Sequence, residues 1–333
     1  MKKIILFVLL FGWSSFVSAN PLSVCATTPE LGNLIQTIGG AEVNVTVFVK
    51  PTEDPHFIEA KPSFIKALSN ADALIFNGLG LEIGWLPVLL QNARNRDVLS
   101  GGRGYMDASQ AIHPLGSPKG IIDRSLGDVH AQGNPHYLLD PINGIKVAGF
   151  ISDRLGVLLP TKKDTFSQNY IIFSKMLGTS LVGEKLFQAY DLDKLGRLYS
   201  YGKLENFLTS QGQGNWLSGW FKEAQSLRGK KVVVDHNLWL YFANRYGFEI
   251  VASMEPKPGI PPSTRHLRRV VNQMKQENVQ MILTSAYYNP RYAQFLAGKT
   301  GAKIYSLANQ VGAQPGTSTY LTMSAYNIEK LVQ

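Results

Sequence analysis

The residues best suited to chemistry are three of the chain's six histidines, His56, His136 and His236. Each stands in a short segment that forms a loop or ends a strand: Glu-Asp-Pro-His-Phe, Gly-Asn-Pro-His-Tyr and Val-Val-Asp-His-Asn. Imidazole is the commonest metal ligand in proteins, and three imidazoles that converge from separate loops form a zinc-type site. The pattern therefore predicts a protein that binds a transition-metal ion.

Two of these histidines follow predicted strands. His56 comes after an apolar strand over 43–49, and His236 comes after the Val-rich strand 231–234. Open α/β sheets bind ligands at the carboxyl ends of their strands, so both positions favour a ligand site. Each position also has an interpretation without a ligand. His56 would then be a surface-loop histidine, and His236 a buried histidine that packs against Trp239. A proline directly precedes both His56 and His136, and this repeated Pro-His pair favours a shared role for the two histidines.

The elements that must position these residues alternate along the chain. Strands are predicted over 22–27, 43–49, 73–77, 231–234, 248–252, 281–284 and 303–307. Helices are predicted over 29–38, 61–70, 85–93, 140–155, 162–190, 239–246, 263–277, 291–300 and 322–332. Such alternation is typical of parallel α/β sheets. Thr28 and Asp140 are the expected N-caps of the helices that follow them, although Asp140 is also suited to accept an imidazole N–H.

This pattern predicts an α/β fold of two lobes, each a mainly parallel β-sheet flanked by helices, joined by one long linking helix. The predicted division is a signal peptide over 1–19, an N-terminal lobe over 20–160, a linking helix over 161–190 and a C-terminal lobe over 191–333. Because His236 ends a strand of the second lobe, the metal site is expected in the cleft between the lobes.

The first nineteen residues have the composition of an export signal. Lys2 and Lys3 precede an apolar run over 4–11, and Val17 and Ala19 supply modest-sized residues at the −3 and −1 positions of a cleavage site. The apolar run is too short for a membrane anchor. We expect cleavage near Ala19 and a periplasmic protein.

The only cysteine, Cys25, raises the alternative of a lipoprotein. Val24 is too bulky for the position before a lipidated cysteine, and Cys25 fits better as a small buried residue of the first strand. A single cysteine allows no internal disulfide, so the exported fold must depend on its core.

Length and charge bound the function further. Cleavage leaves 333 − 19 = 314 residues, enough for two domains, and lowers the formal charge from +9 to +7 because Lys2 and Lys3 are the only charged residues removed. The positive residues are scattered, with the densest group at Arg265, Arg268 and Arg269. An exported protein without a basic recognition face is not expected to bind nucleic acid.

Several segments together resemble one known family, the zinc- and manganese-type metal-binding solute-binding proteins of bacterial ABC importers. The matching segments are Asp-Pro-His at 54–56 with Lys-Pro-Ser at 61–63, Asn-Pro-His-Tyr-Leu-Leu-Asp-Pro at 134–141, His236 with Tyr-Phe at 241–242 and Gly247, and residues 294–302. Their order and the export signal agree as well, so the resemblance covers nearly the whole mature chain.

The resemblance implies two lobes joined by one long helix, with a metal ion bound between them. His56 and His136 would come from the first lobe and His236 from the second. The protein would capture the ion in the periplasm, as a monomer, and deliver it to a membrane permease with its ATPase.

The chain departs from the family at the fourth ligand. Many members supply an aspartate from the loop after the last major strand, whereas residues 306–310 here read Ser-Leu-Ala-Asn-Gln. Water, Glu255, His130 and Asn309 remain candidates for that position. Three neutral imidazoles favour Zn²⁺ over Mn²⁺, because manganese prefers carboxylate oxygen and lies below zinc in affinity at nitrogen sites.

Two other classes of function fit part of the pattern. Three histidines with an open position also describe a zinc-dependent exported hydrolase, with Glu255 or Glu53 as the general base. The chain has neither a His-Glu-Xaa-Xaa-His nor a Gly-Xaa-Ser-Xaa-Gly motif, so no enzymatic activity is predicted. A binding protein for a siderophore, or an adhesin on a similar scaffold, would leave the histidines without a joint role.

Overall fold

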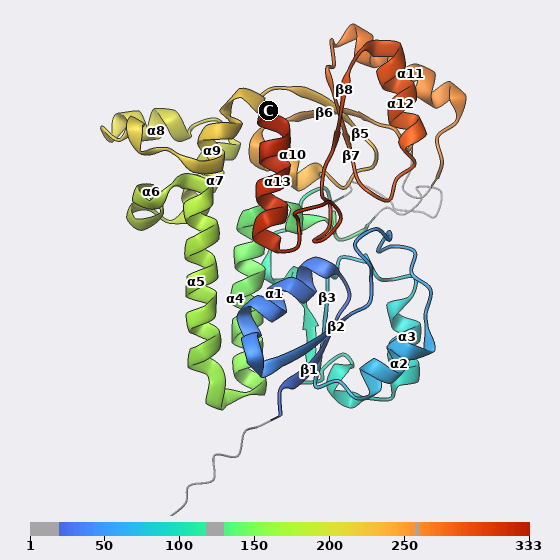
Figure 1. Ribbon diagram of the computed structural model, residues 1–333, viewed down its shortest axis with the longest axis vertical. Helices are drawn as coiled ribbons and strands as arrows, with labels where there is room; N and C mark the ends of the chain where they lie inside the picture. Colours follow the sequence, from blue (N-terminus) through green and yellow to red (C-terminus); the bar gives the residue numbers. More distant parts are fainter. Residues whose placement is uncertain (1–19, 118–129, 257–259) are drawn as a thin grey trace, which may run out of the picture.

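The computed structural model describes residues 20–117, 130–256 and 260–333. Within them the chain builds two parallel four-stranded sheets, one in each lobe, with helices on both sides (Figure 1). The first sheet has the order β2-β1-β3-β4 and the second the order β6-β5-β7-β8. The strands are β1 (Leu22–Ala26), β2 (Val43–Val47), β3 (Ala73–Phe76), β4 (Tyr105–Asp107), β5 (Lys231–Val234), β6 (Glu249–Ser253), β7 (Met281–Thr284) and β8 (Lys303–Ser306). The predicted two-lobe α/β fold is confirmed.

Alternating side chains of the first sheet enter two different cores. In β3, Ala73 and Ile75 face one cluster, and Leu74 and Phe76 face another. Helices α1 (Pro29–Gly39) and α4 (Pro141–Leu158) cover the first face, and α2 (Pro62–Ser69) and α3 (Leu86–Ala93) cover the second. A strand buried on both faces reads as a continuous apolar run, which is why the sequence pattern located β3.

Strand β4 was missed by the sequence analysis. Its three residues, Tyr105–Asp107, are too few to carry a periodicity, and it pairs with β3 at the edge of the sheet. Thr28 occupies the predicted N-cap position of α1, but its side chain makes no capping hydrogen bond.

The long helix of the structure is α5, Lys163–Val182, which lies beside α4 and leads from the first lobe toward the short helices of the second (Figure 1). It ends at Gly183, whose φ of 84° breaks the helix before α6 (Glu184–Ala189). Gly178 lies inside this helix, where its missing side chain leaves room for the Phe187 ring. The exact division into residues 20–160, 161–190 and 191–333 stays a prediction.

The remaining helices belong to the second half of the chain. They are α7 (Leu192–Ser200), α8 (Leu204–Ser210), α9 (Gly219–Glu223), α10 (Leu240–Tyr246), α11 (Thr264–Gln276), α12 (Pro290–Thr300) and α13 (Tyr320–Val332). Short 3₁₀ helices span Gly40–Glu42, Arg96–Val98, Ala108–Ala111, Tyr137–Leu139, Pro160–Lys162, Gly214–Trp216 and Ala224–Leu227. Among the described residues, no helix is both long and apolar enough to cross a membrane.

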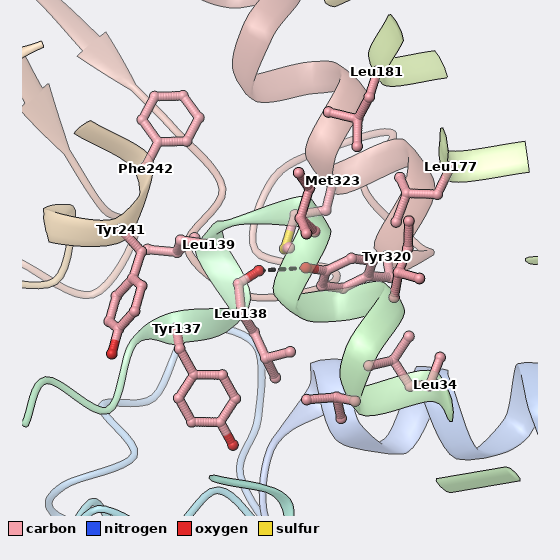
Figure 2. Close-up of a cluster of buried hydrophobic side chains, with 14 of the residues drawn as sticks. Leu34, Tyr137, Leu138, Leu139, Leu177, Leu181, Tyr241, Phe242, Tyr320 and Met323 are labelled. Atoms are coloured by element: carbon pink, nitrogen blue, oxygen red, sulfur yellow. Dashed lines mark hydrogen bonds between the residues drawn. The ribbon is translucent and has the colours of Figure 1, made fainter. Parts of the chain in front are cut away.

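The two lobes share one hydrophobic core, and the 3₁₀ turn Tyr137–Leu139 lies inside it (Figure 2). The Tyr320 hydroxyl at the start of α13 donates to the Leu138 carbonyl at 2.6 Å, the bond drawn in Figure 2. The Tyr137 hydroxyl donates to the Asn77 carbonyl at 2.7 Å. His136 directly precedes this turn, so it lies next to the core that the two lobes share.

A buried ion pair also joins the lobes. Asp140 caps α4 by accepting the Ile142 N–H at 3.0 Å, as predicted. The same carboxylate accepts Arg245 Nε at 2.9 Å and Arg245 Nη2 at 2.7 Å, both from α10. The sequence analysis missed this partner, because the two residues are 105 positions apart and arginine is common on helix surfaces.

Candidate metal centre

The three predicted histidines meet between the two lobes. Their candidate ligand atoms all lie within 4.8 Å of one another. The ring centroids of His56 and His136 are 5.2 Å apart, and both lie 6.0 Å from that of His236. His56 comes from the loop after β2, His136 from the loop before the 3₁₀ turn, and His236 from the end of β5. The arrangement offers three nitrogen donors to one ion.

Asp54 orients the imidazole of His56. Its Oδ1 lies 2.7 Å from His56 Nδ1 and also accepts the His56 backbone N–H at 3.0 Å. Burial alone would raise the pKa of Asp54, but the hydrogen bonds and charge of His56 bring it below its ordinary value. The Trp85 indole N–H donates to the Pro55 carbonyl at 2.9 Å and fixes the same loop. His56 Nε2 is left facing the cluster.

Asn134 connects the loop of His136 to that of His236. Its Oδ1 accepts the His136 backbone N–H at 2.9 Å, and its Nδ2 donates to the Asn237 carbonyl at 2.5 Å. The Tyr241 hydroxyl donates to the Asn134 carbonyl at 2.9 Å and accepts the Leu115 N–H at 2.8 Å. These bonds hold the two ligand loops at a fixed separation across the lobe boundary.

Asp235 organises the turn that carries His236. Its carboxylate is buried and accepts the His236 backbone N–H at 2.8 Å, the Trp239 indole N–H at 3.1 Å and the Ser285 hydroxyl at 2.8 Å. Burial raises the pKa of Asp235, and these hydrogen bonds oppose that shift. The His236 ring stacks on Tyr288, with centroids 5.7 Å apart. Trp239, the predicted packing partner of His236, donates its indole N–H to the Asp235 carboxylate.

The surroundings of His136 and His130 favour the neutral imidazole, the form that coordinates metal. Burial first, and then the nearby histidine charges, hold the pKa of His136 well below its usual value. The same causes lower the pKa of His130 to about 4. His136 Nε2 is buried and has no hydrogen-bond partner among the described residues. Such an unsatisfied donor atom beside two other imidazoles is what a metal-free ligand set presents.

The candidates for the fourth position lie at different places. His130 Nε2 is 3.2 Å from His56 Nε2. Glu255 Oε2 is 3.5 Å from His236 Nδ1, so it is placed to orient that ring. Asn309 Oδ1 accepts the Ala286 N–H at 3.5 Å. Glu53, offered as a general base, pairs with Lys50 at 3.5 Å.

A cavity of about 590 Å³ adjoins the cluster. Its wall includes His130, His136, His236 and Glu255. Two members of the triad, His136 and His236, therefore line a cavity whose wall comes from both lobes.

Comparison with known proteins gives one family. The family model described as zinc-uptake complex component A, periplasmic (ZnuA), matches residues 24–180 and 205–333. The manganese ABC transporter substrate-binding lipoprotein PsaA of Streptococcus pneumoniae serotype 4 is 23% identical, with 100% of this chain and 95% of that protein covered. The metal ABC transporter substrate-binding lipoprotein ScbA of Streptococcus cristatus is also 23% identical, with 96% and 91% covered.

Solved structures agree in fold. A crystal structure of ZnuA has a TM-score of 0.66 at 22% identity, covering 94% of this chain and 98% of that one. The manganese-bound periplasmic metal binding protein of Candidatus Liberibacter asiaticus has a TM-score of 0.64 at 19% identity, covering 93% and 97%. The chain therefore belongs to the ZnuA family, the extracytoplasmic substrate-binding proteins that capture divalent metal ions for ABC importers.

Proposed function

We propose that His56, His136 and His236 bind Zn²⁺ as the transported substrate. The observation that carries this assignment is the convergence of three imidazoles, from both lobes, with ligand atoms within 4.8 Å of one another. A tetrahedral zinc ion holds nitrogen donors about 3.3 Å apart, so a small contraction of the set would accommodate it.

The donor set is the basis for zinc over manganese. All three donors are nitrogen atoms, and affinity at nitrogen sites places Mn²⁺ well below Zn²⁺. Relatives are named for both metals, and one solved ZnuA structure has zinc bound while another relative has manganese bound. The preference is thus argued from the ligands of this chain.

Delivery to the permease requires release of the ion. The shared core and the buried pair between Arg245 and Asp140 oppose a wide separation of the lobes. We infer that release proceeds by small lobe shifts and by rearrangement of the loops that carry His56 and His136. The partner is the membrane permease of an ABC importer with its ATPase, and the protein acts on it as a monomer.

We propose a periplasmic protein, with the signal peptide 1–19 removed near Ala19. That segment lies outside the described residues. Cys25 is 2% exposed within β1, and burial raises the pKa of its thiol to about 12. Cleavage before Cys25 would remove Leu22–Val24 from β1, the strand that pairs with both β2 and β3. The place of Cys25 and the preceding residues in the first sheet therefore supports a periplasmic protein over one lipidated at Cys25.

The hydrolase hypothesis is not retained. The family consists of substrate-binding proteins that are not enzymes. Glu255, its proposed general base, lies against the ring of His236 instead.

Metal competition tests the zinc assignment. The metal-free mature protein would be dialysed against equal concentrations of Zn²⁺ and Mn²⁺, and bound metal would be counted by mass spectrometry. We expect one zinc ion per chain and little manganese. Equal occupancy, or an excess of manganese, would refute the zinc preference.

A further inference from the structure

We propose that His130 is a fourth imidazole ligand, which closes on the ion opposite the triad. This inference rests on the proposed function above and adds a residue to the same site. The starting observation is the 3.2 Å separation between His130 Nε2 and His56 Nε2. Their ring centroids lie 5.3 Å apart, nearly the same separation as the 5.2 Å between His56 and His136.

Asp54 fixes which nitrogen of His56 faces His130. Nδ1 lies 2.7 Å from Asp54 Oδ1. An ionised carboxylate only accepts hydrogen bonds, so Nδ1 carries a hydrogen. Nε2 is the nitrogen that faces His130.

His130 faces the site from the other side. Its Nδ1 lies toward Gly80, since a Cβ placed on Gly80 would be 3.4 Å from it. Its Nε2 is therefore the nitrogen that faces His56.

At 3.2 Å the two nitrogens can share one hydrogen, and a metal ion that binds both would displace that hydrogen. Two nitrogen ligands of one tetrahedral zinc ion, each about 2.05 Å from it, are about 3.3 Å apart. The observed spacing is thus that of two ligands of one ion. The Asp54 carboxylate on the far nitrogen of His56 is a usual means of orienting a metal-bound imidazole.

The other candidates are less well placed. Glu255 lies against His236 Nδ1, and Asn309 bonds the Ala286 N–H. Among the described residues, the group with ligand atoms all within 4.8 Å contains only the triad, so His130 has to move inward when the ion binds. Four nitrogen donors would favour zinc further, and departure of His130 would open a position for water during release.

Cobalt is a suitable probe, because four-coordinate Co²⁺ absorbs visible light much more strongly than Co²⁺ with added water ligands. We expect intense bands from the wild-type protein and weak bands from His130→Ala, with a loss of zinc affinity on the order of 100-fold. Added imidazole, which fills the space of the deleted ring, should restore the intense bands. His113→Ala, at an exposed position, is the matched control and should behave as wild type.

The variants separate the two proposals. Unchanged cobalt bands and zinc affinity in His130→Ala, together with lost binding in His136→Ala, would overturn the role of His130 and leave the triad intact. Unchanged binding in both variants would overturn the triad itself. Recovery of the bands with imidazole excludes misfolding as the cause of a loss in His130→Ala.

Discussion

Substitution of Asp54 tests how much of the zinc affinity depends on orientation of a ligand. Asp54 Oδ1 bonds both the ring Nδ1 of His56 at 2.7 Å and its backbone N–H at 3.0 Å. Partners of this kind contribute about 10–100-fold to metal affinity. Asp54→Asn keeps an oxygen acceptor and loses the charge, so we expect a loss of about tenfold, or about 1.4 kcal/mol. Asp54→Ala loses both bonds and should reach about 100-fold, or about 2.7 kcal/mol.

The assay is competition with a chromophoric zinc chelator near neutral pH, with the thermal stability of the metal-free protein measured alongside. Asp107→Asn is the matched control, because Asp107 Oδ1 accepts the N–H of Ser109 two residues later, at 3.0 Å, in the same kind of turn. Wild-type zinc affinity in Asp54→Ala would refute the claim that this carboxylate orients His56.

Three further outcomes are expected. Arg245→Ala leaves the Asp140 carboxylate buried without its charge partner. It should lower the free energy of unfolding, measured by denaturant titration, by about 3–5 kcal/mol. Removal of the exposed pair between Lys175 and Glu184, the control, should lower it by less than about 1 kcal/mol. Zinc affinity should fall as the pH drops, because protons and the ion compete for the same nitrogens, and a flat titration profile would contradict histidine ligation. The metal-free protein should lose stability as the pH falls below about 6.5. The pKa of His136 is lowered in the folded state, so below this pH the unfolded chain binds a proton at His136 that the folded protein does not. Thermal melts of His136→Asn should depend less on pH than those of the wild type.

The sequence was informative where the signal was local. The apolar runs located both sheets, and the Pro-His segments located two of the three histidines that converge. The helix expected over 162–190 ends at Val182, because Gly183 takes a positive φ that L side chains rarely adopt. Strand β4 carried too few residues for any pattern.

Contacts between distant residues could not be predicted from the sequence. Asn134 and Asn237 are 103 positions apart, and Tyr241 bonds a residue 107 positions away. Nothing in the local sequence of Asn134 indicates that it bridges two ligand loops. The role of Asp54 had a local signal, since it lies two residues before a candidate ligand, as Asp-Xaa-His. That signal identifies a partner for the ring only once the loop conformation is known.

The most direct measurement of the central claim is calorimetric titration of the metal-free mature protein with Zn²⁺ and Mn²⁺, beside His136→Ala. The account predicts one tight zinc site per chain, weak manganese binding, and loss of the zinc site in the variant. No tight site for either metal, or a zinc site that His136→Ala leaves unchanged, would contradict it.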